Sequence, residues 1–359
     1  MKILHLPNNI AGVPWALAEA ERARGHDSRV ITFEDNPFGF KADEVLIAGK
    51  ASKLELFAKA FAAFMRNRTG YDVYHFNFGG SLLHAPGFGL TLADLPFYDR
   101  SARKVFTFSG CDARQKYPTL DRVAKTGANA ACHNPDCYGG MCNSGVRDRQ
   151  RRAAIDKAAK YADHFFALNP DLLHFLPAEM SSFCPYVIAD FENLPSKQNP
   201  FFENDQVHFV HAPTDRAAKG TDAILEAVER LQSSYPGRVK LTLVEHCRRE
   251  EALEIYRSAD MLIDQVMIGW YGGVAVEAMK MGVPVASYVE DSDLHLIPEQ
   301  MNRDMAIYRV QESTLYEQLE TLVKSREMIE ELAPKSVAYV DRWHNPVTIS
   351  GQILDVYAA

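Results

Sequence analysis

The sequence has no block of basic residues and no long hydrophobic run, and each absence excludes a class of function. Its 47 acidic residues outnumber its 39 basic ones, and the formal net charge is −8. Without a basic stretch, nothing attracts the chain to the phosphate backbone of a nucleic acid. The apolar stretch before Pro7 is too short for a signal peptide or a membrane span. We therefore expect a cytoplasmic protein that does not bind nucleic acid.

The sequence also lacks fixed-period repeats and low-complexity tracts. Hydrophobic residues make up 47% and charged residues 24% of the chain, which is close to the averages for globular proteins. At 359 residues the chain is longer than a single core usually becomes, so two domains are expected.

Short apolar runs alternate with helix-like stretches along the chain. In the first half, KILHL, SRVITF and KVFTFSG have the character of buried strands, and residues 14–25 form a helix-like stretch that ends at a glycine. A second series begins with QVHFVHA, after a polar linker that contains prolines. The alternation predicts two parallel, doubly wound α/β domains, and ligands would bind in a cleft beyond the carboxyl ends of their strands.

The domain boundaries follow from the same pattern. We expect a Rossmann-like domain over residues 1–192, with a cysteine-rich insert at 111–146, and a second such domain over residues 193–342. The tail at 343–359 has apolar residues at helical spacing and would return to the first domain as a helix.

The strongest chemical signal is the segment HAPTDRAAKGTD. In this segment a strand leads to a loop with Arg216 and Lys219, and a helix begins near Thr221. Helix N-termini favour anions, and fixed cations neutralise the charge of a departing phosphate. The segment therefore predicts a diphosphate site. Two solvated loop cations are the alternative.

The second signal is the segment IDQVMIGWYGGVAVEAM, where a strand runs into a glycine-rich turn and then a helix. Glycines at positions such as Gly272 and Gly273 let the backbone approach a ligand closely. Glu277, in the helix, would accept the hydroxyls of a ribose. A residue that only complements the helix dipole is the alternative.

Together these segments resemble the donor domain of the GT-B glycosyltransferases, specifically the retaining enzymes of glycosyltransferase family 4 (glycosyl transferases group 1). The resemblance extends over nearly the whole chain. It implies that Arg216 and Lys219 bind the donor diphosphate, and that Glu277, the last residue of the family's E-x7-E motif, binds the ribose. The A-M-x-x-G-x-P-V pattern that follows this glutamate is matched by Ala278, Met279, Gly282, Pro284 and Val285.

The sequence departs from the family at the first position of E-x7-E, where Gly269 replaces a glutamate. Backbone amides of the turn from Gly269 to Gly273, which includes Tyr271 and Gly272, would take over the contact with the sugar or phosphate. Residues 264 and 265, an aspartate and a glutamine at the end of the preceding strand, could add side-chain contacts.

Strand ends in the first half supply candidates for acceptor contacts. The resemblance places Gly12, after the first strand, beside the donor phosphate. His75 and Asn77 lie at the carboxyl end of a predicted strand, where a general base would be needed; a histidine with structural partners only is the alternative. The segment KVFTFSGCDARQ resembles the family's H-G-x-D motif with Ser109 in place of the histidine, and its candidate contacts are Gly110, Asp112 and Arg114.

The resemblance also implies a mechanism. Transfer in this family retains the configuration of the sugar, and the leaving phosphate assists the acceptor, so neither an enzymic nucleophile nor a catalytic metal is expected. The absence of a Ser-His-Asp order or paired carboxylates therefore excludes nothing. The D-x-D at Asp291 and Asp293, a metal motif in another glycosyltransferase fold, is interpreted as coincidence.

Four of the six cysteines fall in one segment rich in glycine, asparagine and proline, at Cys111, Cys132, Cys137 and Cys142. Such a segment has no core of its own, and four thiolates around a structural zinc would stabilise it. Disulfides, thiols or an iron–sulfur cluster are the alternatives, and His133 is a substitute ligand. We expect this insert to shape acceptor specificity.

The sequence therefore predicts a retaining, metal-independent glycosyltransferase that moves a sugar from a nucleotide-diphosphate sugar to a glycan, lipid-linked or small-molecule acceptor. A nucleotide-sugar epimerase or hydrolase on the same fold, and a non-catalytic nucleotide-sugar-binding protein, are the alternatives. The segment KLELFAKAFAAFMRNR has an apolar face and basic residues elsewhere. Ordinary packing explains this pattern, and peripheral contact with the inner face of the membrane is the alternative.

Overall fold

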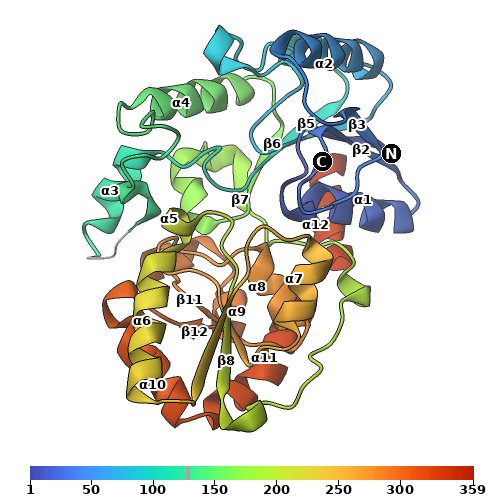
Figure 1. The fold of residues 1–359 in the computed structure, drawn as a ribbon. Helices are drawn as coiled ribbons and strands as arrows, with labels where there is room; N and C mark the ends of the chain where they lie inside the picture. Colours follow the sequence, from blue (N-terminus) through green and yellow to red (C-terminus); the bar gives the residue numbers. More distant parts are fainter. Residues whose placement is uncertain (127–129) are drawn as a thin grey trace. The chain divides into compact units, whose positions relative to one another are not determined.

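The computed structural model describes residues 1–126 and 130–359. These residues divide into two compact units, each built on one parallel sheet (Figure 1). Unit 1 consists of Met1–Gln115, Met141–Ala189 and Pro346–Ala359, and unit 2 of Lys116–Gly140 and Asp190–Asn345. The predicted α/β class with two doubly wound, Rossmann-like domains is confirmed.

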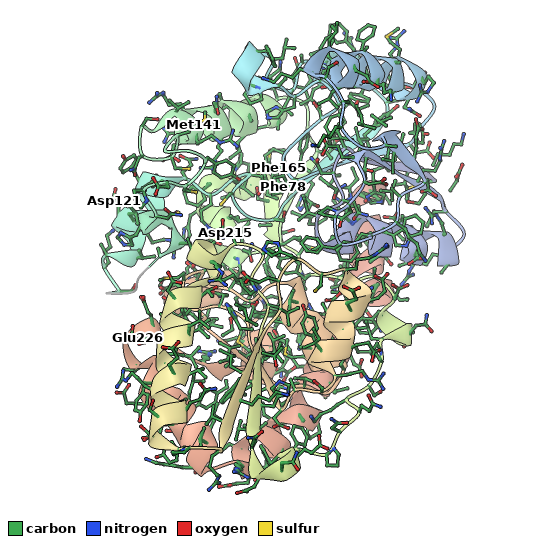
Figure 2. All side chains as sticks on the ribbon, viewed as in Figure 1. Phe78, Asp121, Met141, Phe165, Asp215 and Glu226 are labelled. Atoms are coloured by element: carbon green, nitrogen blue, oxygen red, sulfur yellow. The ribbon has the colours of Figure 1, made fainter. Side chains whose placement is uncertain are left out.

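The sheet of unit 1 has the order β3-β2-β1-β4-β5-β6-β7. Its strands are β1 (Lys2–Leu6), β2 (Asp27–Glu34), β3 (Glu44–Ile47), β4 (Val73–Asn77), β5 (Arg103–Phe108), β6 (His164–Ala167) and β7 (Ser181–Phe183). The α-helices of unit 1 are α1 (Val13–Ala23), α2 (Lys53–Asn67), α4 (Val146–Ala158) and α12 (Pro346–Ala358). Parallel strands are covered on both faces and therefore consist of apolar runs. Ile3, Leu4 and Phe165 are fully buried, and Figure 2 shows Phe165 among the side chains of unit 1.

A buried polar network holds the C-terminal helix α12 against the rest of unit 1. The hydroxyl of Tyr357 donates to Glu21 Oε1 over 3.4 Å and lies 2.5 Å from His75 Nδ1. His5 Nε2 lies 2.9 Å from the other carboxylate oxygen of Glu21. All four side chains are buried. Hydrogen bonds from protein groups, and not from water, therefore offset the cost of burying the Glu21 carboxylate.

The sheet of unit 2 has the order β12-β11-β10-β8-β9. Its strands are β8 (Val207–His211), β9 (Val239–Leu243), β10 (Met261–Ile263), β11 (Val285–Ser287) and β12 (Tyr308–Arg309). Its α-helices are α3 (Lys116–Val123), α5 (Arg216–Lys219), α6 (Thr221–Ser234), α7 (Arg249–Tyr256), α8 (Gly273–Lys280), α9 (Glu299–Asp304), α10 (Leu315–Lys324) and α11 (Glu327–Trp343).

Helices cover both faces of this second sheet. Helices α6 and α10 pack together on one face, and α8 packs with α11 on the other (Figure 1). Helix α6 buries Ile224, Val228 and Leu231, at the spacing of one helical face, while Glu226 points outward (Figure 2). This packing leaves the carboxyl ends of β8 and β10, with the loops that follow them, to form a site.

The structure differs from the expected division at the cysteine-rich insert, because Lys116–Gly140 belongs to unit 2 and not to the first domain. Arg122 Nη1 donates to both carboxylate oxygens of Asp293, over 2.9 and 2.8 Å. The amide of Ala131 donates to the carbonyl of Met267 over 3.2 Å. A segment without periodicity gives no indication of the surface on which it packs, so this attachment was not predicted.

Helix α2 of unit 1 has an exposed apolar stripe. Its buried face holds Ala60, Ala63 and Phe64, while large apolar side chains at helical spacing stay exposed on another face, namely Leu54, Phe57, Phe61 and Met65. Among the residues that the structure describes, no helix is both long and apolar enough to cross a membrane. The stripe is therefore a surface feature of an otherwise packed helix.

Candidate functional site

Arg216 and Lys219, the predicted pair of cations, are the first and last residues of the short helix α5. The carboxylate of Asp215 caps this helix by accepting a backbone amide over 2.9 Å. Gly220 follows with a φ of +74°, and a Cβ there would lie 2.4 Å from Val266 Cγ2. Only glycine fits such a position, so Gly220 is required by the turn that carries Lys219 to the end of β10.

Asp264, directly after β10, joins Lys219 to the start of helix α8. Lys219 Nζ donates to Asp264 Oδ1 over 2.5 Å, and the amide of Gly272 donates to Oδ2 over 2.9 Å. Asp264 is only 1% exposed. A Cβ on Gly272 would lie 3.5 Å from Lys219 Nζ. The carboxylate therefore places a cation beside the N-terminus of α8, where the helix dipole also favours an anion.

Arg216 pairs with Glu245, which follows β9. Two parallel hydrogen bonds of 2.8 and 2.7 Å join the guanidinium to the carboxylate, and the bond from Arg216 lowers the pKa of Glu245. The Arg216 side chain is 50% exposed. Water and salt screen an exposed ion pair, so a ligand with more negative charge can displace Glu245 from the guanidinium.

Glu277 lies on α8 with its carboxylate buried beside Arg249, the first residue of α7. Arg249 Nε donates to Glu277 Oε1 over 2.6 Å, and Nη1 donates to Asp190 Oδ2 over 3.0 Å. Burial raises the pKa of Glu277, and the charge of Arg249 opposes this rise. The hydrogen bond from Arg249 thus orients the carboxylate of Glu277 through Oε1.

Glu245 and Arg249 are site residues that the sequence analysis missed. Both lie in the connection that follows β9, and Glu277 follows β10 by way of the glycine-rich turn. The carboxyl ends of parallel strands meet at one edge of a sheet. Position after a predicted strand was therefore the only signal that could have identified them.

The side chain of Gln265 and the backbone of Glu290 both hold the turn between β10 and α8. Gln265 is buried, accepts the amide of Met267 over 2.9 Å and donates to the carbonyl of Trp270 over 2.8 Å. The amide of Glu290 donates to the carbonyl of Gly269 over 3.0 Å, and a Cβ on Gly269 would lie 2.5 Å from that of Glu290. The side chain of Gln265 thus organises the turn, and Gly269 is required by its packing.

Tyr271 was predicted to contact the nucleotide sugar as part of the backbone of this turn, and the structure gives its side chain a structural role. Its side chain is fully buried, and its hydroxyl lies 2.6 Å from that of Tyr339 and 2.9 Å from His344 Nε2. A large aromatic ring with a satisfied hydroxyl is most stable in the interior. Tyr271 therefore anchors the turn to α11, and at the start of α8 lie Gly272 and Gly273.

His211, the last residue of β8, is hydrogen-bonded to the end of β10 and to the start of α6, which directly follows the segment that carries Arg216 and Lys219. Nδ1 lies 2.7 Å from the carbonyl of Ile263, and Nε2 lies 2.8 Å from the hydroxyl of Thr221. A carbonyl can only accept, so Nδ1 carries the proton and Nε2 accepts from Thr221. Burial, assisted by the charge of Lys219, lowers the pKa of His211 to about 4. A neutral imidazole thus fixes the first residue of α6.

In unit 1, His75 was a candidate general base, and the structure supports the structural alternative instead. It lies in the middle of β4 and is fully buried. Nδ1 lies 2.5 Å from the Tyr357 hydroxyl and Nε2 lies 2.6 Å from Thr107 Oγ1. Burial lowers its pKa well below the usual value. A histidine with both nitrogens bonded in the interior cannot take a proton from a substrate.

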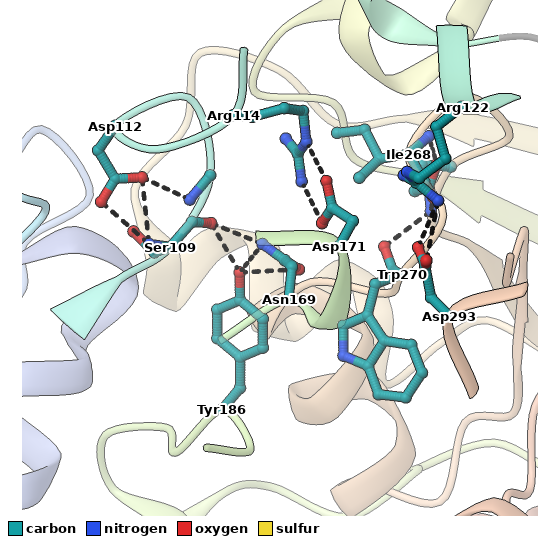
Figure 3. A network of polar contacts seen from close by, with 12 residues as sticks. Ser109, Asp112, Arg114, Arg122, Asn169, Asp171, Tyr186, Ile268, Trp270 and Asp293 are labelled. Atoms are coloured by element: carbon teal, nitrogen blue, oxygen red, sulfur yellow. Dashed lines mark hydrogen bonds and ion pairs between the residues drawn. The ribbon is translucent and has the colours of Figure 1, made fainter. Parts of the chain in front are cut away.

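Asp112 organises the loop after β5. Its carboxylate accepts the amide of Ser109 over 3.1 Å (Figure 3) and the amide of Gly110 over 2.7 Å. Burial raises the pKa of Asp112 to about 6. Arg114 is buried and makes two hydrogen bonds to Asp171, over 2.6 and 2.9 Å. The guanidinium of Arg114 is thus used within unit 1, whereas Gly110 and Asp112 stay candidates for a ligand contact.

Gly12 is the N-cap of α1 and has a φ of +72°. A Cβ at this position would lie 2.6 Å from a ring carbon of Phe40. The positive φ and the nearby ring are together sufficient to require glycine at this position. Its presence in the sequence is explained without a phosphate.

The predicted zinc site is not formed. Over residues 1–126 and 130–359 there is no group of three or more His, Cys, Asp or Glu side chains arranged to hold a metal ion. Cys111 and Cys142 belong to unit 1, whereas Cys132 and Cys137 belong to unit 2. Cys142 is buried, with its sulfur 3.6 Å from a guanidinium nitrogen of Arg151. Within the described residues the four cysteines thus show no preformed metal site.

The buried state of His211 leads to a testable pH dependence. An unfolded histidine has a pKa of about 6.5, and that of folded His211 is about 4. As the pH falls from about 6.5 to about 4, the unfolded chain binds a proton that the folded protein does not, and unit 2 loses stability. We expect an NMR titration midpoint near 4 for the imidazole signal that His211→Gln removes. A midpoint between about 6 and 7 would contradict the burial argument.

The sequence matches no protein-family model and no curated protein. The structure, in contrast, resembles solved structures over its full length. Sucrose-phosphate synthase from Thermosynechococcus elongatus is 18% identical with a TM-score of 0.61, covering 100% of this chain and 98% of that chain. HepE from Anabaena, solved with UDP-glucose, is 13% identical with a TM-score of 0.63, covering 100% and 99% of the two chains.

An epimerase also shares this architecture. UDP-GlcNAc 2-epimerase from Neisseria meningitidis, solved with UDP-GlcNAc, is 13% identical with a TM-score of 0.54, and 100% of each chain is covered. Identities at this level establish a shared fold and not a shared reaction. The chain therefore has the fold of the GT-B glycosyltransferases, with two Rossmann-like domains.

Proposed function

We propose that the protein is a glycosyltransferase that binds a nucleotide-diphosphate sugar in unit 2 and transfers the sugar to a glycan, lipid-linked or small-molecule acceptor. The observation that carries the proposal is the alignment of Lys219 with the N-terminus of α8 through Asp264. Such an arrangement suits a diphosphate, which needs both backbone donors and a fixed cation. The complex of HepE with UDP-glucose shows that the fold accommodates this class of ligand.

The charged groups of unit 2 have complementary parts in this proposal. Lys219 and the amide of Gly273, at the start of α8, bind the diphosphate. A unit charge at 4 Å from Lys219 gains about 4 kcal/mol at an effective dielectric constant of about 20, before desolvation is subtracted. Arg216 exchanges Glu245 for the phosphate. Glu277 accepts a ribose hydroxyl at Oε2, because Arg249 occupies Oε1.

The reaction we propose retains the configuration of the sugar. The bond between the anomeric carbon and the phosphate oxygen breaks while the acceptor oxygen attacks the same face, and the acceptor proton passes to the departing phosphate. Lys219 and Arg216 neutralise the charge that develops on the diphosphate. No protein nucleophile or catalytic metal takes part. For the donor phosphate and the acceptor, Gly12, Gly110 and Asp112 of unit 1 are the candidate contacts.

Substitutions in unit 2 test the donor site. Lys219→Ala and Arg216→Ala should each weaken donor binding about 10- to 100-fold, since a hydrogen bond to a charged group contributes about 1.5–3 kcal/mol. Glu277→Gln should weaken nucleotide-sugar binding about tenfold by the same argument. The wild type is first screened by thermal shift against UDP, GDP, ADP and dTDP sugars, because a ligand stabilises by mass action. Calorimetry with the best donor then gives the dissociation constants.

Lys240→Ala is the matched control, because Lys240 is exposed on β9, and its donor affinity should equal that of the wild type. The donor-site assignment fails if no nucleotide sugar shifts the wild type. It also fails if Arg216→Ala and Lys219→Ala leave the shift intact.

The competing function is an epimerase or hydrolase, favoured by the Gly269 substitution and by the epimerase of the same fold. Product analysis by NMR separates the reactions when the donor is incubated with and without a panel of acceptors. A transferase releases nucleoside diphosphate mainly with acceptor present. An epimerase produces a second nucleotide sugar without acceptor, and a hydrolase releases free sugar. A non-catalytic binding protein leaves the donor unchanged in every mixture.

We also propose that α2 contacts an anionic membrane surface, which would bring the enzyme to a lipid-linked acceptor. Leu54 is 78% exposed, and Phe57, Phe61 and Met65 are each between 44% and 48% exposed. Four basic side chains on or just after this helix are also exposed, at Lys53, Lys59, Arg66 and Arg68. An apolar stripe with flanking cations is typical of helices that lie in a membrane interface.

Vesicle sedimentation tests this surface. Wild-type protein should bind vesicles of phosphatidylglycerol and phosphatidylcholine more tightly than phosphatidylcholine alone. The double substitution Phe57→Ser with Phe61→Ser should reduce this binding tenfold or more, because each buried phenyl ring contributes about 1.5–3 kcal/mol. Met328→Ser, at an exposed position of unit 2, serves as control. Equal binding by the double variant and the wild type would exclude α2 as the contact.

A further inference from the structure

The insert Lys116–Gly140 forms one wall of a pocket in unit 2. The pocket has a volume of about 300 Å³. The insert contributes Ala130, Ala131, His133 and Asn134, and the other wall includes Arg216 and Met267. Arg216 is the only one of the proposed diphosphate cations in this lining. The pocket therefore begins where the proposed diphosphate site ends.

This wall is fixed to the sheet of unit 2 at several points. Arg122 binds both oxygens of Asp293, which is 2% exposed (Figure 3). An ion pair with so little exposure is much less screened than one on the surface. The hydroxyl of Thr126 donates to Glu290 over 3.3 Å. Lys116 Nζ donates to the carbonyl of Asn134 over 3.0 Å, which joins the first residue of the insert to the segment that follows residue 129.

The insert also braces the turn that follows β10. Its Ala131 amide donates to the carbonyl of Met267, and a Cβ on Gly220 would lie 2.9 Å from Met267 Cγ. Met267 therefore lies between the insert and the turn that carries Lys219. On its other side the turn packs against Glu290 at Gly269, a position that has no side chain to offer a sugar. The contacts to a sugar must come from elsewhere.

The lining suits a sugar ring. A volume of about 300 Å³ is at the lower end of the range of about 300–1,000 Å³ for ligand pockets, so it fits a single ring better than an oligosaccharide. Ala130 and Ala131 offer apolar surface for the C–H face of a ring. His133, Asn134 and Asp222 are of the types that exchange hydrogen bonds with hydroxyl groups.

Resting on the proposed function, we infer that this pocket receives the glycosyl group of the donor and that the insert selects the sugar. Ala130, Ala131, His133 and Asn134 form the selecting wall, and Arg122 with Asp293 positions it. The insert thus contacts the donor, whereas the sequence analysis expected it to shape acceptor specificity. A nucleobase is the competing occupant.

The substitution Ala131→Trp fills the pocket and tests the inference. Calorimetry compares a nucleoside diphosphate with its sugar conjugate, using UDP and UDP-glucose, or GDP with GDP-mannose or ADP with ADP-glucose if the screen selects another base. We expect the dissociation constant of the nucleoside diphosphate to change less than twofold and that of the nucleotide sugar to rise at least tenfold. Unchanged diphosphate binding also shows that the variant is folded. The matched control is Ala124→Trp, an exposed alanine of the insert outside the pocket, and both constants should stay unchanged.

Other outcomes overturn the inference. If Ala131→Trp weakens both ligands equally, the pocket binds the nucleobase. If neither ligand is affected, the insert does not contact the donor. His133→Ala removes an exposed side chain and covers the case in which Ala131→Trp does not fold. For this variant the ratio of the affinities for UDP-glucose and UDP-galactose, or for the corresponding pair of the selected base, should change at least threefold. An unchanged ratio overturns the inference. A wild type that binds no nucleoside diphosphate defeats the proposed function itself, and the first titration reveals this.

Discussion

The buried carboxylate of Asp264 determines where the other groups of the site lie. A carboxylate with 1% exposure must be paired with donors, because an uncompensated buried charge costs several kcal/mol. Its two oxygens take one donor from the loop after β8, Lys219, and one from the start of α8, Gly272. The demand of one carboxylate for partners thus joins two loops and presets a cation beside a helix N-terminus. A ligand that binds there finds the groups already in place, which lowers the entropy that binding must lose.

The candidate site contains the ion pairs of Lys219, Arg216 and Arg249 with Asp264, Glu245 and Glu277, and the burial of each pair determines whether it can open for a ligand. Lys219 with Asp264 and Arg249 with Glu277 have little exposure on both sides, whereas Arg216 is half exposed. Separating a buried pair leaves a charge without water or partner, and separating an exposed pair leaves both ions hydrated. Arg216 is therefore the group that can exchange its partner. The two buried pairs instead keep Lys219 and Glu277 in fixed positions.

The sequence predicted the regular elements well and the isolated aromatic and histidine side chains poorly. KILHL and QVHFVHA lie in β1 and β8, because apolar runs bounded by turns carry a local signal. Tyr271 looked like part of a ligand-binding turn, but its partner Tyr339 lies 68 residues later in the sequence, and no local pattern reports such a distance. His75 had the same difficulty, since the helix that supplies Tyr357 is at the other end of the chain. Gly12 and Gly269 were noted in the sequence as positions near a ligand, but the positive φ at Gly12 and the crowding at both positions explain these glycines without a ligand.

The insert illustrates how a loop can add a local feature to an α/β fold. The sheet of unit 2 sets the positions of Lys219 and Glu277 through the ends of β8 and β10, and strand ends of this kind are where ligands bind in open α/β sheets. The residues that select the sugar of a donor need not lie at strand ends, so a loop can supply them. A loop discriminates only if it is held rigidly, because a mobile wall adapts to every ligand at similar cost. The Arg122–Asp293 pair and the Ala131–Met267 hydrogen bond hold the insert in this way, and of these four residues only Met267 belongs to a motif by which the donor site was first noticed.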